Sequence, residues 1–144
     1  MASKKPWPAS LFWGSTMIDR HARNLFTIAA SFNIIVGICF LVAMQPFARL
    51  IGMNPLPSDP LFVHFGAVLV LTFGWGYWRI SRDPVVNRPI IHMGILGKSL
   101  VVIAGYVDWA SGNTNWPFAF LVSGDAVFVA LFVDYLRRHP LRSA

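Results

Sequence analysis

Two apolar stretches long enough to span a membrane each carry one charged residue well inside them. Lys98 lies within residues 89–110, and Asp125 lies within residues 117–136. A charge in the hydrocarbon region is costly, so it normally faces a partner or a water-filled cavity. An oppositely charged pair could fix the register of two helices, or it could serve a ligand, an ion or a proton. Both roles stay open from the sequence.

The depths of the polar residues are compatible with a direct meeting. Along ideal helices, Lys98 lies roughly 12 Å and Asp125 roughly 18 Å from the ends that face the same side. A third polar residue, Asn33, lies roughly 13–14 Å deep in the first apolar stretch, level with Lys98. We therefore expect Asn33, Lys98 and Asp125 to form an intramembrane polar cluster, either as anchors of a ligand or as a packing device.

Two helix faces would carry this cluster. Positions that recur every three or four residues share one face of a helix. On the third stretch these positions are Ile91, Gly94, Lys98, Val101, Gly105 and Asp108. On the first stretch they are Phe26, Ala30, Asn33, Gly37 and Phe40. In a membrane, the face that holds small and polar residues packs on neighbouring helices, so both faces are predicted to turn inward.

Two further features have alternative interpretations. His64 near the start of the second stretch and Asp108 near the end of the third lie on the same predicted side. They form a candidate outer mouth of a pocket, and simple solvation at the interface is the alternative.

The aromatic segment 73–78, which includes Gly74 and Gly76, predicts an interfacial belt with close helix packing. Its alternative is a wall of a lipophilic pocket.

The composition predicts an integral membrane protein. Of the 144 residues, 56% are hydrophobic and 12% are charged, and the mean hydropathy is +0.56, which leaves too little polar surface for a soluble domain. The length predicts a single domain over residues 1–144. The basic residues behind the net charge of +6 flank the apolar stretches. We therefore expect anionic lipid headgroups, and not nucleic acid, as their partners.

Four apolar stretches predict the fold. They cover about residues 24–44, 60–80, 89–110 and 117–136, and about 20 residues suffice to cross roughly 30 Å of hydrocarbon. Pro60, Pro89 and Pro117 stand where the last three begin, at positions where the missing N–H costs nothing. Residues 1–23 form an interfacial or cytoplasmic lead-in. The prediction is an all-α, antiparallel four-helix transmembrane bundle.

The distribution of lysine and arginine predicts the orientation. Ten of the twelve basic residues lie in the N-terminal segment, around the connection between the second and third stretches, or at the C-terminus. Arg49 alone flanks the opposite side, and Lys98 lies within a span. By the positive-inside rule, both termini face the cytoplasm.

The residue inventory disfavours several kinds of chemistry. The chain has no glutamate, one cysteine and four scattered histidines. His64 and His92 fall at opposite ends of the spans, so a haem ligated within the chain is not expected. The histidines are too few for a di-iron centre, and no Ser-His-Asp or Cys-His set is arranged for nucleophilic catalysis. We predict no catalytic residues, no metal and no cofactor, and we favour a protein that is not an enzyme.

A resemblance adds to this interpretation. The residues that carry it are Arg79–Pro84, Gly94–Lys98, Gly124–Asp125, Phe132 and Tyr135–Leu136. In these segments the chain resembles small four-span bacterial inner-membrane proteins and, more loosely, the DoxX-like group. The resemblance implies an inner-membrane location and a four-span topology, and it draws attention to Lys98 and Asp125. It implies no activity.

Three functions follow as expectations. The first is a small non-enzymatic accessory or structural subunit, either in a homo-oligomer or in a larger inner-membrane complex. The second is a binder, carrier or modifier of a lipophilic molecule in a pocket around Lys98 and Asp125, since ligand sites are apolar cavities with a few convergent polar groups. The third is proton-coupled transport through the same pair.

Overall fold

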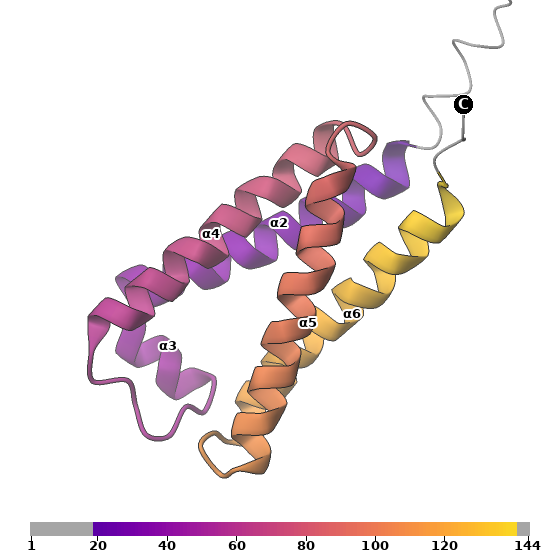
Figure 1. Ribbon diagram of the computed structural model, residues 1–144. Helices are drawn as coiled ribbons and strands as arrows, with labels where there is room; N and C mark the ends of the chain where they lie inside the picture. The colour runs from indigo at the N-terminus through magenta and orange to yellow at the C-terminus, as the bar shows by residue number, and fades with distance from the viewer. Residues whose placement is uncertain (1–18, 141–144) are drawn as a thin grey trace, which may run out of the picture.

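The computed structural model describes residues 19–140, and this part of the chain is helical without β-strands (Figure 1). Its five helices are α2 (Asp19–Val42), α3 (Met44–Leu50), α4 (Pro60–Arg82), α5 (Arg88–Ala110) and α6 (Trp116–Arg138). All except α3 are long and apolar enough to cross a membrane. These four helices support the assignment as an integral membrane protein.

The helix starts follow the proline signals in the sequence. Pro60, Pro89 and Pro117 each lie in the first turn of a long helix, as predicted. The start of α4 is also capped, because the carboxylate of Asp59 accepts a hydrogen bond of 2.8 Å from the backbone N–H of Leu61. Such a cap satisfies one of the N–H groups that a helix start leaves without a partner.

The first span and the segment after it differ from the prediction. Helix α2 begins at Asp19 instead of about residue 24, and the rest of the expected lead-in, residues 1–18, lies outside the described residues. The connection between the first two predicted stretches begins with the short helix α3. Pro46 did not prevent this helix, because it occupies the first turn, where a proline removes no helical hydrogen bond.

The long helices associate most closely in two pairs, α2 with α4 and α5 with α6 (Figure 1). Glycine permits the close approach within the first pair. A Cβ atom added to Gly74 would lie 2.9 Å from the Cγ1 atom of Ile34, which is shorter than real Cβ contacts. The pairing of α2 with α4 also gives Asn33 a neighbour on α4, which the sequence did not reveal.

The two pairs join through an aromatic core at one end of the molecule. Phe26 of α2 lies 4.9 Å from Phe132 of α6, and Tyr77 of α4 lies 5.3 Å from Phe132, between ring centroids. Helix α5 adds Ile91, which is fully buried, to the same cluster. Aromatic rings in tilted and edge-on contact stabilise such a core beyond the area they bury.

At the opposite end, the two connecting segments touch. Met53 forms an isolated β-bridge with Thr114, and the N–H of Asn115 donates to the carbonyl oxygen of Gly52 at 3.3 Å. Gly52 adopts a φ of 72°, a conformation that glycine tolerates readily. The two helix pairs therefore contact each other at both ends of the molecule.

The outer faces of the long helices are apolar. Large hydrophobic side chains are exposed on every one of them, among them Ile28, Ile35, Phe65, Val68, Leu96, Ile103, Phe120 and Val127. A monomeric soluble protein rarely exposes continuous apolar surface of this extent. Lipid chains are a suitable environment for these faces.

Candidate functional site

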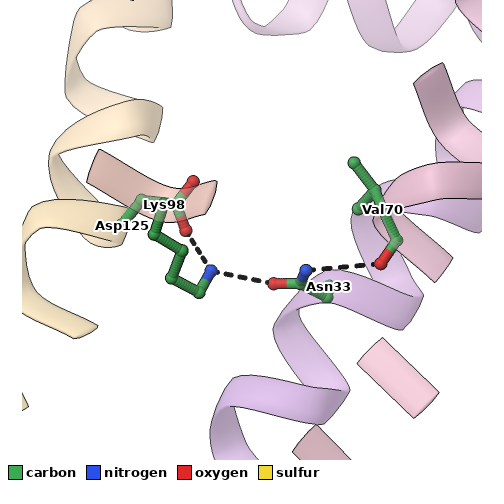
Figure 2. Close-up of polar contacts among 4 residues, drawn as sticks. All are labelled: Asn33, Val70, Lys98 and Asp125. Carbon is green, nitrogen blue, oxygen red and sulfur yellow. Dashed lines mark hydrogen bonds and ion pairs between the residues drawn. The ribbon is translucent and has the colours of Figure 1, made fainter. Parts of the chain in front are cut away.

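Lys98 lies at the centre of a polar cluster that draws on three helices (Figure 2). Its ammonium group forms an ion pair and a hydrogen bond with the Oδ1 atom of Asp125, and it donates a second hydrogen bond of 3.0 Å to the Oδ1 atom of Asn33. The structure thus brings together the three residues that the depth comparison placed at similar levels. Each comes from a different helix: α2, α5 or α6.

The amide of Asn33 extends the cluster to a fourth helix. Its Nδ2 atom donates to the backbone carbonyl of Val70 on α4, at 3.3 Å (Figure 2). Only one orientation of the amide places its oxygen against the ammonium and its nitrogen against a carbonyl. Asn33 therefore links the charged pair to the backbone of α4, and all four long helices contribute to one hydrogen-bonded chain.

Three aromatic rings surround the ammonium group of Lys98. The Nζ atom lies 5.0 Å from the ring centroid of Phe128, 5.3 Å from that of Tyr77 and 5.6 Å from that of Phe32. A cation within about 6 Å of a ring face is attracted by the ring quadrupole, and the attraction grows when water is excluded. We call these three rings the aromatic cage. It stabilises the charge of Lys98 on the sides that the carboxylate and the amide leave open.

A cavity of about 530 Å³ lies between the two helix pairs and borders the polar cluster. Asn33, Lys98 and Asp125 are among its lining residues, and the remaining walls are almost entirely apolar. Representative apolar residues are Phe32 and Val36 from α2, Val70 and Phe73 from α4, Val101 from α5 and Leu121 from α6. The volume falls within the range of about 300–1,000 Å³ that is typical of small-molecule sites.

The surroundings of the cavity indicate how it opens. The aromatic core lies beyond Tyr77 at one end, and Met53 of the bridged connection lines it at the other. Phe62, Leu69 and Val101 line the cavity and have exposed side chains. The helices therefore do not enclose the cavity completely.

The predicted inward faces are largely buried. On α5, Ile91, Gly94, Lys98 and Gly105 are buried, whereas Val101 and Asp108 are exposed. On α2, the predicted face is buried from Phe26 to Gly37 and half-buried at Phe40. Gly94 is needed for this packing, because an added Cβ atom would lie 2.7 Å from the Cε1 atom of Tyr77.

The structure does not bring the two residues of the candidate outer mouth together. Within residues 19–140 no hydrogen bond or ion pair joins His64 to Asp108, and neither residue lines the cavity. The carboxylate of Asp108 instead accepts a hydrogen bond of 3.2 Å from the side chain of Asn113 in the following turn. That local contact accounts for Asp108 without a pocket.

The segment 73–78 lines the cavity on one side, whereas its expected role as an interfacial belt stays a prediction. Phe73 and Tyr77 line the cavity, whereas Trp75 and Trp78 are exposed on the other side of α4. Arg79 lies over the ring of Trp75 at 5.6 Å, an arrangement typical of a membrane interface. One short segment therefore supplies a cavity wall on one side of α4 and exposed tryptophan side chains on the other.

The aromatic cage is the part of the site that sequence reasoning missed. Phe128 lies three residues after Asp125 and so shares its helix face, which was an available signal. Phe32 directly precedes Asn33, and neighbouring positions do not share a face in a simple helical pattern. Tyr77 lies on α4, whose packing against α2 and α5 the sequence did not reveal.

The chemistry available at the site is recognition by charge, hydrogen bond and apolar contact. In the described part of the chain, no group of three or more His, Cys, Asp or Glu side chains could hold a metal ion.

Comparisons of the chain with protein-family models, curated proteins and solved structures found no match. The resemblance to small four-span bacterial membrane proteins therefore stays a prediction.

Proposed function

We propose that this protein binds a lipophilic small molecule between its helices, within the membrane. The observation that carries the proposal is the incompletely enclosed apolar cavity of about 530 Å³ with one charged pair in its lining. A charged pair that only fixed helix register would need no cavity beside it. An apolar cavity with a few polar groups at one place is the usual form of a small-molecule site.

The proposal includes a topology. We infer an antiparallel four-helix transmembrane bundle in a bacterial inner membrane, with both termini in the cytoplasm. The support is the basic end of the molecule, where Arg79, Arg82, Arg88, Arg137 and Arg138 lie at the ends or starts of helices. Anionic lipid headgroups would be the natural partners of these residues.

A second candidate function is an accessory subunit in a homo-oligomer or a larger membrane complex. The observation in its favour is the exposed apolar surface on all four long helices, which another membrane protein could cover as well as lipid can. In this alternative the charged pair would serve packing alone. Proton-coupled transport through Lys98 and Asp125 has no additional support.

The test is native mass spectrometry of the protein extracted with its surrounding lipid. We expect the wild type to retain one lipophilic molecule, and Gly66→Leu to lose it. Gly66 lines the cavity, and an added Cβ atom there meets nothing within 4 Å, so a larger side chain can fill space without displacing the backbone. Val68→Leu on the exposed side of the same helix is the matched control and should retain the molecule.

Two other results would change the conclusion. Equal retention by the wild type and Gly66→Leu would show that the molecule binds outside the cavity. A stoichiometric protein partner or a fixed homo-oligomer, with no small molecule retained, would favour the accessory subunit.

A further inference from the structure

The polar residues of the cavity differ in how much of each one a ligand can reach. The side chain of Lys98 is 4% exposed and Asn33 is 7% exposed, whereas the side chain of Asp125 is 14% exposed. All three line the cavity, as does the fully buried Tyr77, and the side chain of Asp125 is the most exposed of the four. A ligand in the cavity would therefore meet this carboxylate first.

Lys98 is already occupied by the protein. Its ammonium group donates to Asp125 and Asn33, and the three rings of the aromatic cage lie around it. Because only 4% of the lysine side chain is exposed, an anionic headgroup could reach little of the ammonium. The lysine thus serves to hold the carboxylate and is poorly placed to receive a ligand.

One oxygen of Asp125 remains available as an acceptor. Its Oδ1 atom takes the bond from Lys98, and within residues 19–140 no hydrogen bond is recorded to its Oδ2 atom. Figure 2 shows a dashed line to only one of the two carboxylate oxygens. An ionised carboxylate only accepts hydrogen bonds, so the complementary ligand group is a donor.

The charge balance of the site further restricts the ligand. Lys98 and Asp125 carry opposite charges and neutralise each other. A charged headgroup would add an unpaired charge to a poorly solvated cavity, and this is strongly unfavourable. A neutral donor avoids that cost and satisfies the carboxylate.

We propose that the cavity selects neutral lipophilic molecules that carry a hydroxyl group, and that Asp125 accepts the hydrogen bond from this hydroxyl. This inference rests on the proposed function, since it names the class of ligand that the cavity takes. It assigns Lys98 and Asn33 the role of holding Asp125 in place.

The experiment uses the methyl signals of methionine in the full-length protein, labelled with ¹³C and embedded in lipid nanodiscs. Met53 lines the cavity, whereas Met93 is exposed on α5, where it borders a separate and shallower hollow beside Arg88 and His92, and it reports binding anywhere outside the cavity. Three probes built on an unbranched chain of twelve carbon atoms are titrated: 1-dodecanol, its methyl ether and dodecanoate. The wild type alone supplies the decisive comparison, so no variant has to fold.

We expect 1-dodecanol to shift the Met53 signal at a concentration at least about tenfold lower than the methyl ether or dodecanoate, because a site built around a hydrogen bond rejects analogues that lack the donor. In the double variant Lys98→Met/Asp125→Leu, the alcohol and the ether should bind about equally. In both proteins, Met93 should respond equally to the alcohol and the ether.

Two results would overturn the inference in distinguishable ways. If all three probes shifted Met53 equally in the wild type, or if dodecanoate bound most tightly, the cavity would bind lipophiles without selecting a hydroxyl donor. If no probe moved Met53 while Met93 responded, the cavity would not bind lipophiles at all, and the proposed function would fail together with the inference.

Discussion

At the scale of single residues, the site surrounds an almost fully buried lysine with polar and aromatic partners. One carboxylate, one amide oxygen and the aromatic cage surround the ammonium of Lys98. An isolated lysine at the centre of a membrane helix costs about 2.5–3.5 kcal/mol on insertion scales. These contacts offset that cost. The effects on stability of replacing Lys98 and of replacing Asp125 should therefore not be additive.

Removing one member of the pair should be far more damaging than removing both. We expect Lys98→Met or Asp125→Leu alone to lower the free energy of unfolding by about 3–5 kcal/mol, because either change leaves an uncompensated buried charge. The double variant should lose much less, since two apolar side chains of suitable volume can replace a buried ion pair at little cost. Reversible unfolding in mixed detergent micelles would measure the three values.

The exposed pair of Arg138 and Asp134 provides the control for this comparison of single and double variants. The two residues are four apart on α6 and are largely exposed, so removing either should change stability by no more than about 1 kcal/mol. Additive losses in the double variant of Lys98 and Asp125 would contradict the interpretation of the pair as a unit.

At the scale of helices, Arg88 links the beginning of α5 to the end of α6. Its Nη1 atom donates to the carbonyl oxygen of His139 at 2.6 Å, and its Nη2 atom donates to that of Leu136 at 3.3 Å. The last carbonyl groups of a helix have no partner within the helix, and a positive charge there also interacts favourably with the helix dipole.

Replacement of Arg88 should loosen the last turn of α6. We expect Arg88→Ala to destabilise the protein by about 1.5–3 kcal/mol, the usual contribution of hydrogen bonds to a charged group. Hydrogen exchange should accelerate in the backbone amides of the last turn of α6 and remain slow in the middle of that helix. Arg82→Ala, at the exposed end of α4, is the matched control. Uniformly faster exchange along α6 would contradict a local role for Arg88.

The helices themselves were largely predictable, whereas their pairing was not. Apolar length and the three prolines predicted α4, α5 and α6 closely, because both signals act within a single helix. The meeting of Lys98 with Asp125 followed from depth along neighbouring helices. The pairing of α2 with α4 depends on side-chain fit at Gly74 and Ile34, and no periodic pattern encodes that contact. The aromatic cage and most of the cavity walls follow from this pairing, so the sequence predicted a pocket around Lys98 and Asp125 only as one of several alternatives.

At the scale of the whole molecule, the basic residues predict which end faces the cytoplasm. Single cysteines introduced into a Cys39→Ala background test this orientation. Ser58→Cys lies in the connection before α4, and Val86→Cys lies in the exposed turn between α4 and α5.

In intact cells whose outer membrane has been permeabilised, a membrane-impermeant maleimide should label Ser58→Cys. Val86→Cys should react only after the inner membrane is also opened, because the arginine-rich end is retained in the cytoplasm. The opposite pattern would invert the proposed topology, and equal labelling of both would indicate insertion in two orientations.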